Sequence, residues 1–429
     1  MSLRERLVAT IDAQEGEFLA ALCGFALFFC LLAGYFMLRP IREAMAILGG
    51  VENLQWLFTA TFVAMLVAVP LFAWLNSVVP RRHYVDWVHG FFVLNLLAFA
   101  ALFVVGDSVW AGRVFYVWIS VYNLFVVSVA WSLMADVFDA AQATRLFAVI
   151  AAGASCGGLC GPALGALLIG SIGQSGLTVL SAALLAATIP FKHYLVRWRE
   201  THGAGRPGAP PAESALRPVA GNPFSGIALV LRSPWLLAVA AFVMLLATTS
   251  TFLYFEQARL VAERFHDRAA QIRVFGLLDF TVQALSLVSQ LFITGRLAER
   301  FGVAALLAGV PALVCITFIA LALSPGFAML AIAMIVRRVG EYAYVRPARE
   351  MLFAALDAQT KYKAKNFIDT VVYRAGDTAS AWVRTLLDTL GTSVMLAALA
   401  GAGFAALWSG IGWYLGRDRS RRGPATPDS

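Results

Sequence analysis

Twelve stretches of about 20 mostly apolar residues run along this chain, each long enough to cross the ~30 Å hydrocarbon core of a bilayer as a helix. Of the 429 residues, 60% are hydrophobic and only 14% are charged, whereas soluble domains have roughly 45–50% and 25%. No aqueous fold could bury that much apolar surface. The sequence therefore predicts an all-α membrane protein of about twelve transmembrane helices in two six-helix pseudo-repeats.

The twelve stretches fall into two groups of six, separated by a polar interval. The first group lies at roughly 18–38, 54–76, 84–105, 110–135, 146–170 and 175–195. The second group lies at roughly 235–258, 271–294, 302–323, 326–348, 365–389 and 391–415. The interval from Arg199 to Phe224 is rich in Gly, Pro and Ala, which indicates a flexible linker. The domains expected are a leader at 1–17, helical bundles at 18–198 and 235–415, a linker at 199–234 and a tail at 416–429.

The distribution of Lys and Arg predicts the orientation in the membrane. With both termini inside, the inner loops and tails carry about 20 of the 33 Lys and Arg residues, and the outer loops carry about 5. The first apolar stretch is too long for a secretory signal peptide and lacks a small-residue cleavage site. We therefore expect a multi-pass protein of the plasma (inner) membrane of a bacterium-like cell, with both termini cytoplasmic.

Several other functions are disfavoured. The positive-inside rule explains the net charge of +8 better than nucleic-acid binding does. No Gly-x-x-x-x-Gly-Lys-Ser/Thr loop is present, and the five histidines are scattered outside any metal-ligand spacing. We expect no enzyme activity, no cofactor, no metal and no nucleic-acid partner. The five cysteines lie inside apolar runs and indicate neither a disulfide nor a zinc framework.

Charged residues inside the apolar stretches are the main candidates for function. Such a charge costs about 2.5–3.5 kcal/mol on insertion scales, so it persists when it is paired, faces water or has a function. Segment one ends in Arg39-Pro40-Ile41-Arg42-Glu43, where Arg39 and Glu43 can pair and Pro40 should open the helix locally. Segment ten repeats this Arg-Pro-x-Arg-Glu pattern. We expect a substrate-binding site formed by Arg39, Arg42, Glu43, Arg346, Arg349 and Glu350, in which the four arginines hold an anion. Snorkelling arginines at ordinary helix ends are the alternative.

Segment eleven carries a polar stripe along one helical face. Residues on this face recur at helical spacing and are Asp369, Tyr373, Asp377, Ser380 and Arg384. Arg374 sits beside the stripe. The pattern predicts either a face toward a cavity or a salt-bridged seam between helices.

Other acidic residues suggest gate or coupling pairs. Segment eight has a polar face formed by Asp279, Gln283, Ser286 and Gln290. In segment seven, Glu256 precedes Arg259 by three residues and either simply pairs with it or takes part in gating. We expect the pairs that break and re-form during transport to involve Glu256, Asp279, Glu341, Asp369, Arg374 and Asp377.

Two glycine-containing patterns indicate helix packing and a family. Gly153, Gly157, Gly161 and Gly165 recur every four residues, a spacing that allows close helix approach, although the run also resembles the Gly-Pro signature of facilitator-type antiporters. The run GRLAERFG at 295–302 resembles the inner-loop signature of the major facilitator superfamily. The two halves also resemble each other at an offset of about 215 residues, as parallel transporter repeats do. This resemblance implies a major facilitator-like fold.

Segments ten and eleven resemble the ATP/ADP translocase family, the nucleotide transporters of plastids and intracellular bacteria. The run EYAYVRPAREM at 341–351 is similar to that family's stretch ending Pro-x-Lys-Glu-Met. Leu356-Asp357, three alternating lysines at 361–365 and the run at 368–376 match its Leu-Asp, alternating-Lys and Ile-Asp-x-Val-x-x-Arg-x-Gly pattern. Leu38 to Glu43 resembles its Leu-Arg-Asp-x-Lys-Asp/Glu run.

The resemblance implies roles for individual residues. Arg42 and Arg349 stand where the family has transport-essential lysines, and Glu256 stands near one of its essential glutamates. The family's fourth-segment glutamate has no counterpart in Ser128-Val129-Ala130-Trp131. An arginine fork suits phosphate or carboxylate oxygens.

These patterns lead to three functional hypotheses. The first is a secondary active transporter of a small anionic solute that works by alternating access, with nucleotide exchange of the ATP/ADP type as its expected activity. The second is proton-coupled transport of another organic anion or organic phosphate. The third is a non-transporting membrane sensor. The solute and the lipid bilayer are the partners expected, and the oligomeric state is left open, with a monomer as one option.

Overall fold

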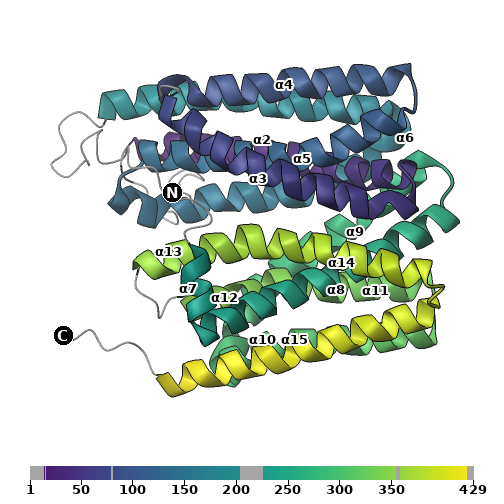
Figure 1. The fold of residues 1–429 in the computed structure, drawn as a ribbon. Helices are drawn as coiled ribbons and strands as arrows, with labels where there is room; N and C mark the ends of the chain where they lie inside the picture. Colours follow the sequence, from purple (N-terminus) through teal and green to yellow (C-terminus); the bar gives the residue numbers. More distant parts are fainter. Residues whose placement is uncertain (1–13, 15, 79–80, 203–225, 354–357, 423–429) are drawn as a thin grey trace. The chain divides into compact units, whose positions relative to one another are not determined.

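A computed structural model describes residues 14, 16–78, 81–202, 226–353 and 358–422 (Figure 1). Most of the predicted leader, the centre of the linker, the end of the tail and the Leu356-Asp357 pair lie outside the described residues. All regular elements in the described ranges are helical. The predicted all-α fold is therefore confirmed.

The first half of the chain forms long helices. They are α2 (Glu17–Leu48), α3 (Leu54–Val78), α4 (Arg81–Val105), α5 (Val109–Val137) and α6 (Ala140–His202), with a short 3₁₀ turn η1 (Val51–Asn53) before α3. Within α6, Gly173 has a φ of 65°, a left-handed conformation that glycine adopts without steric cost. This turn divides α6 into the predicted fifth and sixth segments.

The second half contains more, shorter elements. They are α7 (Ile227–Arg232), α8 (Pro234–Arg264), α9 (Arg268–Ser289), η3 (Gln290–Thr294), α10 (Gly295–Leu323), α11 (Phe327–Val339), η4 (Gly340–Val345), α12 (Arg346–Phe353), α13 (Ala358–Asn366), η5 (Phe367–Val372), α14 (Tyr373–Thr389) and α15 (Val394–Arg422). The elements η3, η4 and η5 are π-helices. Gly302, with a φ of 74°, breaks α10 where the eighth segment gives way to the ninth.

The described residues account for the twelve predicted segments. Eight stretches are long and apolar enough to cross a membrane. Two of these, Ala141–His202 and Arg268–Leu323, each hold two segments divided at Gly173 and Gly302. The remaining two segments are the helical runs at 327–353 and 358–389, which η4 and η5 interrupt.

One predicted boundary is wrong. Segment one was expected to end near residue 38 and to open at Pro40, but α2 continues without a break to Leu48. Pro40 removes one backbone donor, yet Leu38 and Ile41 around it are fully buried, so side-chain packing holds the helix together. Arg39, Arg42 and Glu43 consequently lie inside a helix rather than at its end.

The chain divides into two compact units. Unit 1 comprises Met1–Leu48, Val67–Val219 and Asp267–Phe280, and unit 2 comprises Gly49–Leu66, Ala220–His266 and Thr281–Ser429. Each has its own apolar core, with Phe28 and Phe115 buried in unit 1 and Phe242 and Trp408 buried in unit 2. In both units the first segment packs on the fifth and the third packs on the sixth, as two related six-helix repeats require.

A ladder of glycines brings α6 against α2 in unit 1. A Cβ atom on Gly153 would lie 2.2 Å from Phe25 O, and one on Gly157 would lie 2.4 Å from Phe29 O. Gly161 meets Ala33 O in the same way, at 2.4 Å. Each step of four residues along α6 is matched by a step of four residues along α2, in the same direction. The two helices therefore run parallel and in backbone contact. The packing interpretation of this pattern is confirmed.

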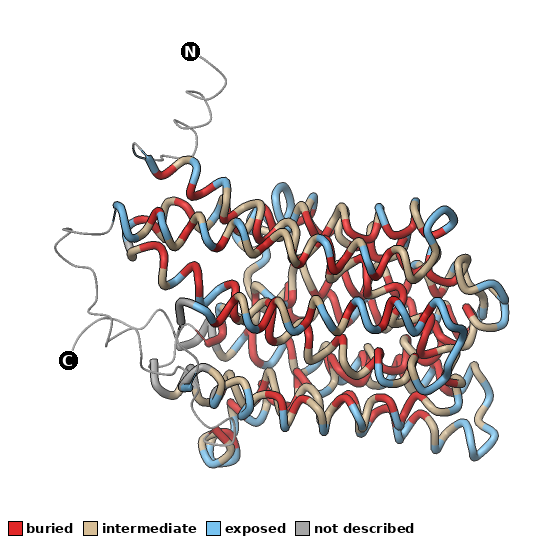
Figure 2. The backbone as a smooth tube through the Cα atoms, turned by 90° about the horizontal axis from the view of Figure 1, so that it is seen from above, coloured by how far each residue is buried: buried red, intermediate tan, exposed pale blue. Residues whose placement is uncertain are grey.

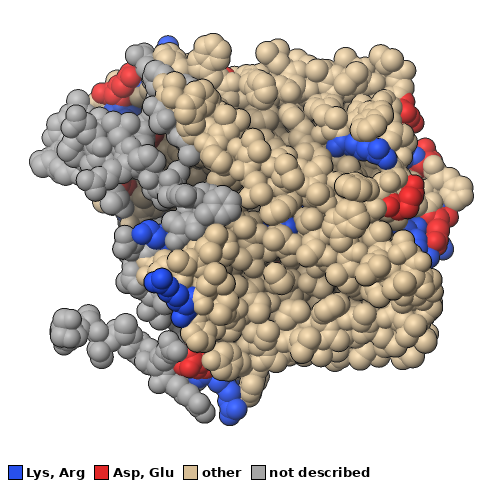
Figure 3. Space-filling model, in the orientation of Figure 1, with Lys and Arg blue, Asp and Glu red and all other residues tan. Residues whose placement is uncertain are grey.

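The helix surfaces suit an apolar solvent. Buried and exposed residues alternate along the helices in Figure 2, and exposed positions include large apolar side chains such as Leu94 of α4, at 68%, and Ile316 of α10, at 60%. On the face drawn in Figure 3, most charged side chains lie near the ends of the helices. Apolar side chains in mid-helix with charges at the helix ends are typical of membrane-spanning helices.

Candidate functional site

The charged group of unit 1 centres on the last third of α2. Arg39 forms an ion pair with Asp279 of α9, with its Nε 3.7 Å from Oδ2, and its side chain is 22% exposed. Arg42 forms an ion pair with Glu43 at 3.2 Å and donates from Nε to the carbonyl oxygen of Tyr116 at 3.4 Å. Its guanidinium also lies 4.0 Å from the centre of the Tyr116 ring, a cation–π contact. Unit 1 thus holds two ion pairs in this region, Arg39 with Asp279 and Arg42 with Glu43.

The glycine ladder fixes the position of this group. Gly161 and Gly165 hold α6 against Ala33 and Met37 of α2, directly before Arg39. Because backbone contact leaves no room for sliding, the arginines follow a helix with a fixed register and orientation.

The matching Arg-Pro-x-Arg-Glu run of unit 2 begins α12. Arg349 forms an ion pair with Asp369 of η5 at 3.1 Å, and only 12% of its side chain is exposed. Glu350 binds the ammonium group of Lys365 at 2.5 Å. Arg346 is 59% exposed and lies 3.9 Å from Glu341, which also accepts a hydrogen bond from Arg337 at 2.9 Å. Through these ion pairs, the run connects α12 to α13 and η5.

The part of the polar stripe that lies on α14 faces α8 within unit 2. Ser380 donates to the Thr248 hydroxyl at 2.8 Å, and Thr251 donates to Asp377 at 3.3 Å. Arg374 lies beside the stripe, 3.6 Å from the same carboxylate. Asp377, Ser380 and Arg384 are all buried. For this part of the stripe, the contacts are those of a polar seam between two helices.

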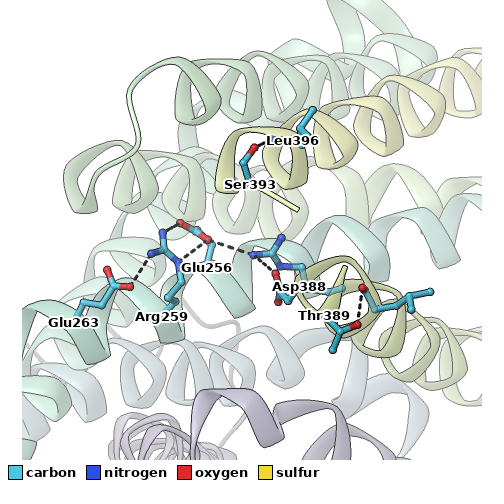
Figure 4. Close-up of polar contacts among 9 residues, drawn as sticks. Glu256, Arg259, Glu263, Asp388, Thr389, Ser393 and Leu396 are labelled. Carbon is cyan, nitrogen blue, oxygen red and sulfur yellow. Dashed lines mark hydrogen bonds and ion pairs between the residues drawn. The ribbon is translucent and has the colours of Figure 1, made fainter. Parts of the chain in front are cut away.

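Glu256 holds two arginines together near the end of α8 (Figure 4). Arg259 donates to it at 2.5 Å and also binds Glu263 at 2.7 Å. From α14, Arg384 lies 3.7 Å from Glu256 and 3.2 Å from Asp388. Glu256 is therefore more than the partner of Arg259, because it also connects α8 to α14.

The predicted site residues thus fall into separate groups. Unit 1 brings Arg39, Arg42, Glu43 and Asp279 together on α2 and α9. Unit 2 brings Arg349 to Asp369, Arg346 to Glu341, and Arg374 to Asp377. Glu256 of α8 belongs to a further group. Its member on α14, Arg384, lies seven residues after Asp377. The stretch from Arg337 to Asp377 holds eight Lys or Arg and five Asp or Glu residues, a surplus of three positive charges.

Two features of these groups could not be read from the sequence. Tyr116 stacks on Arg42 although the two residues lie 74 positions apart, and no spacing rule relates them. Gln290 and Thr294 donate to main-chain oxygens of η4, and backbone acceptors carry no side-chain signature. The sequence predicts Gln290 only as part of a polar face.

Comparison with known proteins gives a consistent picture of the fold. A sequence model described as the Major Facilitator Superfamily matches residues 21–345. No curated protein matches the chain at a significant level.

Three solved transporter structures resemble this chain. A bacterial homologue of the human lysosomal transporter Spinster, inward-facing and unoccupied, is 13% identical with a TM-score of 0.66, covering 97% of this chain and 100% of that one. The nucleoside transporter NupG is 13% identical with a TM-score of 0.64, covering 94% and 99%. The human organic anion transporter MFSD10 is 16% identical with a TM-score of 0.56, covering 94% and 100%. At these identities the likeness concerns the fold.

Proposed function

Because the chain belongs to the Major Facilitator Superfamily, we propose that it carries a small anionic solute by alternating access and that this solute is a nucleotide. Members of this superfamily are integral membrane transporters of small solutes and not enzymes. This protein is likewise an integral membrane transporter and not an enzyme. The nature of the solute is the proposal.

The observation that carries the proposal is the surplus of positive charge between Arg337 and Asp377. A cation inside a membrane protein is costly unless a negative charge compensates it, and in this stretch Lys and Arg outnumber Asp and Glu by three. The side chain of Arg349 is 12% exposed and forms an ion pair with Asp369. An anionic solute with several oxygens would complete the pairing, because a guanidinium presents five donors in a planar fork.

Two further observations support a nucleotide. Residues 38–43 and 341–376 resemble runs of the ATP/ADP translocase family, in which basic residues at the positions of Arg42 and Arg349 serve transport. NupG, which shares the fold, is a nucleoside transporter. A nucleotide adds phosphate oxygens to a nucleoside and suits a site with more arginines than carboxylates.

Exchange in proteoliposomes tests this function. Purified protein is reconstituted into vesicles loaded with ADP, and uptake of labelled ATP is followed with and without internal ADP. We expect uptake that depends on internal nucleotide and is competed by other nucleotides. Uptake of none of a full panel of nucleoside mono-, di- and triphosphates would exclude the nucleotide assignment.

A second candidate is proton-coupled transport of another organic anion or organic phosphate. It is favoured by two buried carboxylates, Asp279 and Asp377, which form ion pairs with Arg39 and Arg374. MFSD10, with the same fold, is an organic anion transporter. Uptake that is driven by an imposed pH gradient and needs no internal counter-solute would favour this candidate over exchange.

A further inference from the structure

Three π-helices occur in the described part of unit 2, and two of them adjoin the proposed anion-binding residues. The π-helix η4 ends directly before Arg346, and η5 contains Asp369. A π-helix is rare because its i to i+5 hydrogen bonds pack less well than those of an α-helix, and it persists where other contacts hold it. These contacts can be identified for η4.

Side chains of η3 bind the backbone of η4. The amide nitrogen of Gln290 donates to Tyr342 O at 3.1 Å. The hydroxyl of Thr294 lies 3.0 Å from Ala343 O and is shared with Ser289 O of its own helix. At the start of η4, a Cβ atom on Gly340 would lie 2.4 Å from Val310, so the absence of a side chain lets η4 approach α10.

The π register decides where the following arginines point. A π turn contains one residue more than an α turn, and each residue of an α-helix turns the chain by about 100°. If η4 became α-helical, α12 would rotate by about 100° relative to α11, and a side chain on it would move by about 8 Å around a helix 10–12 Å wide. Arg349 would then lose its 3.1 Å contact with Asp369.

We propose that Gln290 and Thr294 are positioning residues for transport, which hold η4 in its π register and so direct Arg346 and Arg349 toward the solute. This inference rests on the proposed role of these arginines in anion binding. In a membrane-spanning segment, a backbone carbonyl that loses its hydrogen-bond donor costs free energy, and Gln290 and Thr294 supply such donors to Tyr342 O and Ala343 O. The donors from η3 therefore make the π form the stable one.

A distance measurement tests the register without any solute. In protein whose five cysteines have been replaced, spin labels are placed on exposed positions of unit 2, at Met351 of α12 and Leu313 of α10. Gln290→Leu combined with Thr294→Val removes both donors while keeping side-chain size. We expect the distance between the labels to shift by several ångströms, up to about 8 Å. Thr294→Ser, which keeps the hydroxyl, should leave it unchanged.

The same variants are then tested for uptake of labelled ATP. We expect Gln290→Leu with Thr294→Val to raise the Michaelis constant about tenfold, because a displaced Arg349 no longer gives the anion a charge-assisted hydrogen bond. Thr294→Ser should transport normally. An unchanged label distance in the double variant would refute the inference, and so would a shifted distance with normal uptake. If the unaltered protein moves no nucleotide while the distance still shifts, the proposed solute is wrong but the control of the register by η3 stands.

Discussion

Arg42 and Arg349 are the residues on which anion recognition most directly depends. Each is mostly buried, bound to one carboxylate, and placed on a helix that crosses the apolar part of its unit. The surrounding contacts hold each guanidinium in one orientation, with the Tyr116 ring beneath Arg42 and Asp369 beside Arg349.

We expect Arg42→Ala and Arg349→Ala each to abolish solute uptake in proteoliposomes while the protein still inserts and purifies. Arg349→Lys should retain part of the activity with affinity reduced roughly 10- to 100-fold, because an ammonium keeps the charge but loses the fork that gives charge-assisted bonds. Arg264→Ala, at an exposed position of α8, is the matched control. Uptake at the wild-type rate in both alanine variants would show that the arginines do not bind the solute.

Arg259 binds two carboxylates, one buried and one exposed, so their contributions to stability can be compared. Glu256 is 7% exposed and holds Arg259 and Arg384, whereas Glu263 is 56% exposed and binds Arg259 alone. Removing one partner of a buried ion pair costs about 3–5 kcal/mol, and removing an exposed one costs about 0–1 kcal/mol. Thermal unfolding in detergent should therefore show a large loss for Glu256→Ala and almost none for Glu263→Ala. Equal melting temperatures for the two variants would contradict this reading of the network.

At the scale of elements, the sequence predicts helices well and their internal irregularities poorly. Apolar stretches long enough for a bilayer located the twelve segments, because length and hydropathy alone decide that property. Their ends were less predictable. The break at Pro40 failed to occur because packing of its neighbours outweighed one lost hydrogen bond, and the π-helices arise from contacts between distant helices.

In the candidate site, too, some features could be predicted from the sequence and others could not. Charged residues inside apolar segments could be listed from the sequence since each is an energetic exception there. The partner of each charge could not be predicted, because it depends on which helices are neighbours. Arg39 forms an ion pair with Asp279 of α9, and Glu256 forms one with Arg384 of α14. The spacing of Asp377 and Ser380 predicted a common face but not that the face packs on α8.

The contact between α2 and α6 can be tested at a single glycine. Gly157→Ala places a methyl group where Phe29 O lies only 2.4 Å away, so the helices must separate, at a cost of about 1–3 kcal/mol. Gly90→Ala in α4 is the matched control, because no atom lies within 4 Å of its Cβ position and alanine favours the helix. We expect the melting temperature to fall for Gly157→Ala and to stay level or rise for Gly90→Ala. A Gly157→Ala variant as stable as wild type would mean that the two helices are not in backbone contact.

At the scale of the whole molecule, the twelve predicted segments are an even number of crossings. This number predicts that both ends of the chain lie on one side of the membrane. The excess of Lys and Arg in alternate loops predicts that this side is the cytoplasm.

Reporter fusions check this assignment. Green fluorescent protein joined to either terminus should fluoresce in bacterial cells, and alkaline phosphatase joined at the same points should be inactive. Fusion of the phosphatase after residue 107, in the loop between α4 and α5, should restore its activity because this loop is predicted to face outward. An active phosphatase at either terminus would reverse the topology.

The backbone contact between α2 and α6 also has a practical consequence for following the transport cycle. Two helices in backbone contact at several successive turns cannot slide or tilt separately without opening a void or a clash, so we expect them to move as one rigid body. Probes attached to both would keep a constant separation in every state of the carrier. That separation offers an internal standard against which the displacement of any other segment can be measured.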